Sequence, residues 1–156
     1  MDRGATTIES SLANEAATGA LGAAIAQGLK PRDCLMLEGD VGAGKTALAR
    51  AIILPLLPEP EDIPSPTFTL VQTYEAEAFT IWHCDLYRLS DPSELVELGI
   101  ADAFEEDVTL IEWPDRLGSA APAHAQRLHL TVTGEESRAL SVEGDTRWAE
   151  LARALG

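Results

Sequence analysis

The chain has 156 residues, 46% of them hydrophobic, which predicts one globular domain with a single core over residues 1–156. Its formal net charge of −15 argues against direct, nonspecific nucleic-acid binding, because that mode needs lysines and arginines to neutralise phosphates. The sequence has no apolar stretch as long as a membrane span and no basic-then-apolar leader, so a cytoplasmic protein is expected.

Hydrophobic periodicity and breaker residues predict alternating helices and strands in the first two thirds of the chain. The two cysteines, Cys34 and Cys84, fall in apolar strands and are expected to be buried, reduced thiols. Before the proline-rich loop at 55–64, the expected elements are a helix at 12–28 with Leu21 and Ile25 on one face and Gly28 as its cap, a strand at 34–38, and a helix at 47–54 stopped by Pro55. After that loop, they are strands at 67–74 and 79–84, a helix begun by Asp91 and Pro92 and ended by Gly99, and a strand at 108–111.

A β-hairpin followed by a helix is predicted after Pro122, because apolar and polar residues begin to alternate there. The expected parts are a strand with Leu128, Leu130 and Val132 on its buried face, a turn at 134–136, a returning strand at 138–143, and a helix with Trp148, Leu151 and Leu155 on one face.

The segment from residue 39 to residue 46 is a complete match to the phosphate-loop pattern G-x-x-x-x-G-K-[ST]. Its glycines let the backbone curl so that successive N–H groups point at phosphate oxygens. Lys45 brings a positive charge to the β- and γ-phosphates, and the Thr46 hydroxyl is placed to ligate Mg²⁺. ATP and Mg²⁺ are therefore the expected ligands, with nucleotide contacts from Gly39, Asp40, Val41, Gly42, Ala43, Gly44, Lys45, Thr46 and Ala47.

Two carboxylates end apolar strands, Asp85 and Glu112, and with Lys45 they are the candidate catalytic residues. If both strands run parallel to the strand before the loop, both carboxylates face the phosphates. Asp85 would then act in the Mg²⁺ and water shell, and Glu112 as a metal ligand or as the group that polarises the attacking water. The alternatives are a capping role for Asp85 and, for Glu112, an edge carboxylate satisfied by solvent or by Arg116.

The segment 65–69 follows the proline-rich loop and carries three hydroxyl residues, including Thr67. These hydroxyls could reach a γ-phosphate and order the loop as switch segments do, or they could simply form the turn at the start of a strand. Together, the patterns predict an α/β, P-loop NTPase-like three-layer fold with a mixed, mainly parallel central sheet and an antiparallel edge hairpin.

Four stretches, in their order and spacing, resemble the TsaE family, the small bacterial ATPases of tRNA threonylcarbamoyladenosine synthesis. The Asp-Leu-Tyr-Arg and Glu-Trp-Pro segments make the resemblance specific. It extends from the first helix to about residue 116 and, less specifically, over the final hairpin and helix. The four stretches are the phosphate loop, Ser65-Pro66-Thr67-Phe68-Thr69-Leu70-Val71, His83-Cys84-Asp85-Leu86-Tyr87-Arg88-Leu89 and Ile111-Glu112-Trp113-Pro114-Asp115.

The resemblance implies that Thr46 and Glu112 hold Mg²⁺, that Asp85 lies at the nucleotide site, and that the segment 65–69 is switch-like. It also implies a partner, the TsaB–TsaD heterodimer, which transfers the threonylcarbamoyl group and through which tRNA would be reached. In that family, ATP hydrolysis supports multiple turnovers of the partner.

The sequence departs from the family pattern at a few positions. Ala47 stands where a second hydroxyl residue is usual, which removes one α-phosphate contact, and Cys84 and Asp115 replace the common Phe and Glu. Arg138 is a candidate nucleotide contact from the hairpin, with a solvent-facing strand arginine as the alternative.

The leading functional hypothesis is therefore a Mg²⁺-dependent ATPase, weak alone and completed by its partner. A nucleotide-gated docking protein whose hydrolysis is incidental is the alternative from the class of binding modules. A small-molecule kinase ranks last, because the sequence shows no arginine-rich lid segment.

Overall fold

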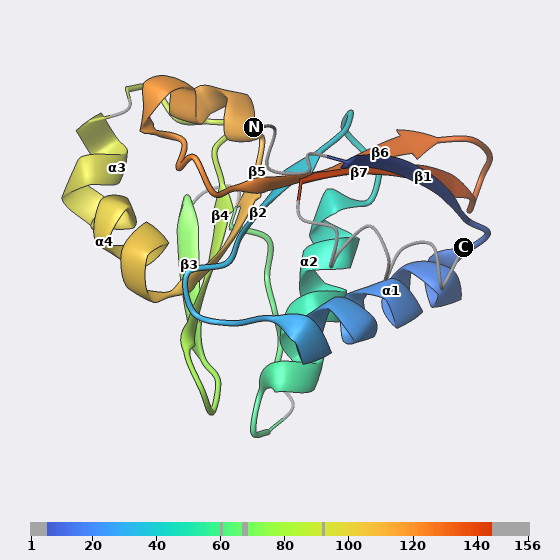
Figure 1. Ribbon diagram of the computed structural model, residues 1–156, viewed down its shortest axis with the longest axis horizontal. Helices are drawn as coiled ribbons and strands as arrows, with labels where there is room; N and C mark the ends of the chain where they lie inside the picture. Colours follow the sequence, from blue (N-terminus) through green and yellow to red (C-terminus); the bar gives the residue numbers. More distant parts are fainter. Residues whose placement is uncertain (1–5, 60, 67–68, 92, 145–156) are drawn as a thin grey trace.

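The computed structural model describes residues 6–59, 61–66, 69–91 and 93–144, and its centre is a seven-stranded sheet (Figure 1). Four adjacent strands in the middle of the sheet run parallel to one another, and antiparallel strands complete both edges, which confirms the predicted mixed sheet. In spatial order the strands are β1 (Thr6–Leu12), β7 (Arg138–Gly144), β6 (Gln126–Val132), β2 (Cys34–Glu38), β5 (Val108–Glu112), β4 (Thr80–Asp85) and β3 (Val71–Glu75).

Helices cover both faces of this sheet, because alternate side chains of the buried strands point to opposite sides. Helices α1 (Glu15–Gly28) and α2 (Lys45–Ile53) pack side by side on one face (Figure 1). The core beneath them includes Leu35 and Leu37 of β2. The opposite core takes in α3 (Ser93–Leu98), α4 (Ile100–Glu106) and the 3₁₀ segment η2 (Pro114–Ala120).

Helices α1 and α2 approach so closely that only glycine fits between them at Gly22, where an added Cβ would collide with Ala51. The predicted face of α1 is confirmed, since Leu21 and Ile25 are both buried. This tight contact fixes α2, and with it the phosphate loop at the start of α2, against the sheet.

The structure differs from the sequence prediction at several boundaries. Residues 6–12 form β1 against β7, and α1 begins only after Asn14, whose side chain accepts from the N–H of Ala17 at 2.9 Å. That helix ends on Leu29 in extended conformation and has no left-handed glycine cap at Gly28. A helix beyond Gly99 was not predicted, yet α4 starts at once after it.

Other boundaries agree with the prediction. Asp91 accepts from the N–H of Ser93 at 2.9 Å and Gly99 has φ 83°, so α3 starts and stops as expected. The hairpin of β6 and β7 is present, although Val132 is 50% exposed because β6 leaves the core at its end. Pro92 and the helix predicted around Trp148, Leu151 and Leu155 lie outside the described residues. Within the described ranges, every helix is too short or too polar to cross a bilayer.

Candidate functional site

The phosphate loop connects the end of β2 to the start of α2. Gly39, Gly42 and Gly44 have φ values of 145°, 81° and 104°, in the range that favours glycine. A Cβ at Gly39 would also lie 2.6 Å from the carbonyl oxygen of Leu130 in β6. The loop therefore needs glycine for its backbone conformation and, at Gly39, for its close approach to the neighbouring strand.

Lys45 is the first residue of α2, and only 5% of it is exposed. Its ammonium donates to the carbonyl oxygens of Gly39 at 2.5 Å and Asp40 at 2.9 Å. Burial lowers the pKa of Lys45, and the nearby carboxylates of Glu112, Asp85 and Asp40 act in the opposite direction. The charge of Lys45 is thus held at the loop by carbonyl oxygens and by surrounding negative charge.

The Glu112 carboxylate joins three separate elements. Thr46 Oγ1 of α2 donates to Glu112 Oε1 at 2.7 Å, and His83 Nε2 of β4 lies 2.6 Å from Glu112 Oε2. Glu112 is 2% exposed and His83 is fully buried. The alternative of an edge carboxylate satisfied by solvent or Arg116 is therefore wrong, and Arg116 instead reaches the carbonyl oxygen of Leu89 at 3.5 Å.

Asp85 lies opposite Glu112 in the register of β4 and β5. Because these strands are parallel to each other and to β2, their carboxyl ends bring both carboxylates to the edge that carries the phosphate loop. Asp85 is 5% exposed, and its Oδ1 accepts from the N–H of Tyr87 at 3.0 Å. The capping contact that we considered for Asp85 is present, while its role toward Mg²⁺ and water stays a prediction.

The Trp113 ring lies against the Lys45 ammonium. Trp113 follows Glu112 in a left-handed conformation, φ 57° and ψ 54°, and its ring centroid lies 4.1 Å from Lys45 Nζ. Its ring also contacts that of Tyr87, with centroids 4.9 Å apart and planes tilted by 50°. Trp113 therefore packs partly against the second core and partly against the phosphate-loop lysine, in a cation–π arrangement.

Arg138, the first residue of β7, reaches the back of the phosphate loop. Its Nε donates to the carbonyl oxygen of Ala43 at 2.9 Å, and its Nη2 donates to that of Gly42 at 3.3 Å. The third nitrogen, Nη1, donates within its own hairpin to the carbonyl oxygen of Ser137 at 2.8 Å. Arg138 is half-buried against the loop, so the solvent-facing alternative is wrong, and a contact to nucleotide itself stays a prediction.

The remaining loop residues have different surroundings. Ala43 is buried, whereas Asp40, Val41 and Ala47 are exposed, and Val41 at the loop tip is 76% exposed. Thr67 lies outside the described residues, so its predicted contact is without structural description. Around it, Leu70 donates to the carbonyl oxygen of Pro66 at 2.8 Å.

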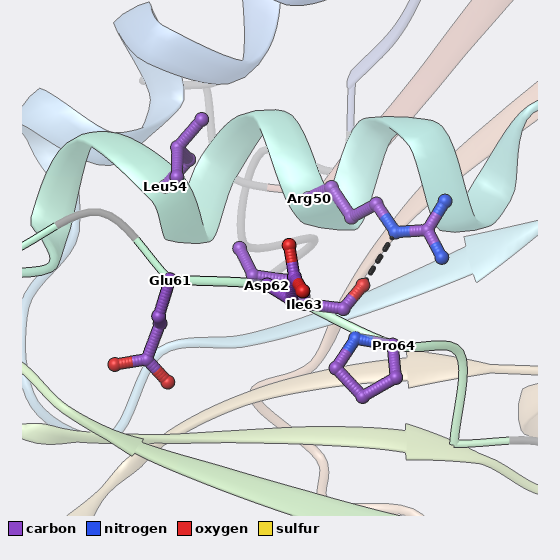
Figure 2. A pocket seen from close by; sticks show the side chains of 6 residues that line it. All are labelled: Arg50, Leu54, Glu61, Asp62, Ile63 and Pro64. Atoms are coloured by element: carbon purple, nitrogen blue, oxygen red, sulfur yellow. Dashed lines mark hydrogen bonds between the residues drawn. The ribbon is translucent and has the colours of Figure 1, made fainter.

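The described part of the proline-rich segment lies along α2 (Figure 2). Leu54–Leu56 continue α2 as a 3₁₀ turn, η1, and Arg50 Nε donates to the carbonyl oxygen of Ile63 at 2.6 Å (Figure 2). A pocket of about 410 Å³ opens here, and the described phosphate-loop residues do not line it. Its lining comprises Arg50, Leu54, Glu61, Asp62, Ile63 and Pro64.

His83 is the site residue that the sequence interpretation missed. The signal was nevertheless present, because His83 stands two positions before Asp85 and a strand repeats its facing direction every second residue. His83 must therefore share a face with Asp85 and with the carboxylate of the adjoining strand.

Comparison with known proteins shows the family to which this chain belongs. The model of a family described as "Threonylcarbamoyl adenosine biosynthesis protein TsaE" matches residues 12–140. Two relatives are named tRNA threonylcarbamoyladenosine biosynthesis protein TsaE. The one from Rickettsia felis is 43% identical over 84% of this chain and 77% of its own length. The one from Bacillus subtilis is 33% identical over 72% of this chain and 70% of its own length. The crystal structure of YdiB from Bacillus subtilis is similar with a TM-score of 0.76 and 25% identity, covering 97% of this chain and 95% of that one. Since the family match spans the phosphate loop, both strand-end carboxylates and Arg138, the chain belongs to the TsaE family.

Proposed function

We propose that this protein is the Mg²⁺-dependent, ATP-binding and ATP-hydrolysing component of tRNA N6-threonylcarbamoyladenosine synthesis and that it supports turnover of the TsaB–TsaD heterodimer. The observation that carries the ATPase proposal is the 2.7 Å hydrogen bond from Thr46 to Glu112. It brings a hydroxyl from the phosphate-loop helix and a carboxylate from a strand end to one point beside a loop shaped for phosphate. Membership of the TsaE family supports the pathway, because its curated members are named for it.

The residues present fit a magnesium ion. The Thr46 hydroxyl and the Glu112 carboxylate are hard oxygen donors, and Mg²⁺ in nucleotide sites takes its other ligands from water and phosphate. A larger cluster of His, Cys, Asp and Glu is therefore not needed, and the described part of the chain contains none. When bound, Mg²⁺ would neutralise charge on the β- and γ-phosphate oxygens. Thr46 and Glu112 would hold it, and Asp85 would orient water beside them.

The phosphate loop supplies the local positive field that an anionic ligand needs in a protein with a net charge of −15. The loop amides and the N-terminus of α2 would bind phosphate oxygens. Lys45 would exchange its carbonyl partners, Gly39 and Asp40, for the β- and γ-phosphates. Because Lys45 is already held at the loop between these carbonyls and the Trp113 ring, little further ordering would be required when it binds.

ATP hydrolysis by the purified protein, alone and with purified TsaB–TsaD, tests the proposal. We expect slow turnover alone, faster turnover with the heterodimer, and loss of both in Glu112→Ala. Glu106→Ala, which removes an exposed carboxylate of α4, is the matched control. Wild-type turnover in Glu112→Ala would contradict the assigned site. A Glu112→Ala protein that still supports the heterodimer without hydrolysis would instead favour the nucleotide-gated docking function.

A further inference from the structure

We infer that His83 is a positioning residue that holds one oxygen of Glu112, so that the other oxygen is presented to Thr46 and to the metal. The inference rests on the proposed function and extends it from the two metal-holding residues to the group behind them. His83 touches Glu112 and neither the phosphate loop nor Thr46 in the contacts described, so it would act only through Glu112.

The strand register places His83 directly behind Glu112. His83 is opposite Leu110 in the parallel pair of β4 and β5, and Glu112 is the next residue of β5 on the same face. His83 therefore lies one two-residue repeat further along the strands from the site than Glu112. It is on the sheet face that also carries the buried side chains of Ile81 and Leu110. An imidazole buried on this apolar face loses hydration, and its bond to Glu112 compensates for that loss.

The hydrogen bond has one chemical direction. An ionised carboxylate only accepts, so His83 Nε2 must donate to Glu112 Oε2 over the 2.6 Å between them. The other ring nitrogen, Nδ1, is buried and has no hydrogen-bond partner within the described residues. A bare lone pair at Nδ1 is better tolerated there than an orphaned N–H, so the contacts assign the hydrogen to Nε2.

As a result of this bond, the two Glu112 oxygens have different partners. Oε2 is tied to β4 by His83, and Oε1 is bonded to the Thr46 hydroxyl. Without His83, the carboxylate would be free to rotate about its terminal torsion, and Oε1 would face Thr46 only part of the time. A donor of this kind behind a ligating carboxylate typically contributes about 10- to 100-fold to metal affinity.

The test measures ATP affinity by calorimetry in EDTA and with saturating Mg²⁺. The dissociation constant in EDTA divided by that in Mg²⁺ gives the ratio by which Mg²⁺ strengthens binding. We expect His83→Leu to lower this ratio by at least about tenfold while leaving the affinity in EDTA unchanged. His83→Gln should keep the wild-type ratio, because the glutamine amide nitrogen takes the place of Nε2. His129→Leu is the matched control, since His129 also faces a carboxylate, Glu38 at 3.5 Å, but is half exposed on β6.

A wild-type ratio in His83→Leu would overturn the inference. So would a His83→Leu protein whose ATP affinity falls by the same factor in EDTA and in Mg²⁺, because that pattern marks a purely structural role. If His83→Leu does not fold, His83→Asn replaces it, since the shorter amide occupies the place of Nδ1 and cannot reach Glu112. Equal ratios in the Gln and Asn variants would then refute a role for the Nε2 donor.

The same titration separates the two levels of the argument. A wild-type protein whose ATP affinity does not respond to Mg²⁺ would overturn the proposed function together with the role of His83. A wild-type protein that responds to Mg²⁺, with the same response in His83→Leu, would overturn only the role of His83.

Discussion

Replacing Arg138 by alanine tests how far the C-terminal hairpin holds the phosphate loop in shape. Arg138 donates to the carbonyl oxygens of Ala43 at 2.9 Å and Gly42 at 3.3 Å. In a trans peptide the C=O and the N–H point in opposite directions. A carbonyl of Ala43 that is held toward Arg138 therefore keeps the N–H of Gly44 directed away from the hairpin.

The size of the effect follows from these two contacts. A hydrogen bond from a charged donor contributes about 1.5–3 kcal/mol. The half-buried bond to Ala43 is counted at the lower end of that range and the longer, exposed bond to Gly42 at a fraction of it, which gives about 2 kcal/mol in total. If ATP binding must restore the same loop conformation, the dissociation constant for ATP rises by at most about 30-fold.

Calorimetric titration of Arg138→Ala with ATP and Mg²⁺ measures this change. Arg32→Ala is the control, because Arg32 is an exposed arginine whose partner, Glu105 at 3.3 Å, lies on α4. Unchanged affinity in Arg138→Ala would refute the reasoning, since it would mean that the loop keeps its shape without the hairpin. A loss well above the bound would show that Arg138 also touches the nucleotide, for which the sequence made it a candidate.

Three further changes test other parts of the structure. Lys45→Ala should weaken ATP binding by at least about tenfold, because a charged donor to the phosphates is lost, and unchanged affinity in calorimetry would contradict the phosphate-loop assignment. Gly39→Ala should lower the free energy of unfolding measured in urea by about 1–3 kcal/mol, since φ is 145° and the new Cβ meets the Leu130 carbonyl oxygen. The control Gly19→Ala should raise this free energy by roughly 0.5–1 kcal/mol, because a Cβ at Gly19 has nothing within 4 Å. Burial raises the pKa of Cys34 to about 11, so at pH 8 its thiolate is scarce and a disulfide reagent should label both buried cysteines only after unfolding; rapid labelling of the native protein would contradict this burial.

The elements that sequence predicted correctly are those whose signals are local. The strand at Cys34–Glu38, the glycine loop and the helix from Lys45 follow one another within a short segment, and each is specified by its own residues. The hairpin of β6 and β7 is also local, because its turn and its alternation are contiguous. The missed strand β1 is different, since residues 6–12 pair with β7 at the far end of the chain and their pattern alone does not show this partner.

The family and its phosphate loop could likewise be recognised from sequence, because a phosphate cradle is built from consecutive backbone groups and a fixed lysine and threonine. Sequence also placed Asp85 and Glu112 at strand ends, which sufficed to bring them to one edge once the strands proved parallel. Their surroundings were left as alternatives, because solvent access to a carboxylate depends on what packs over it.

Only the tertiary structure decided which side chains complete the site. His83 reaches Glu112 through the register of β4 and β5, Trp113 turns back over Lys45, and Arg138 crosses from the hairpin to the loop carbonyls. Each of these contacts joins residues far apart in the chain or depends on a backbone turn that no short pattern specifies. A sequence determines local conformation through its own steric and hydrogen-bonding preferences, whereas the direction and partner of a side chain are set by the packing of elements that meet only after folding.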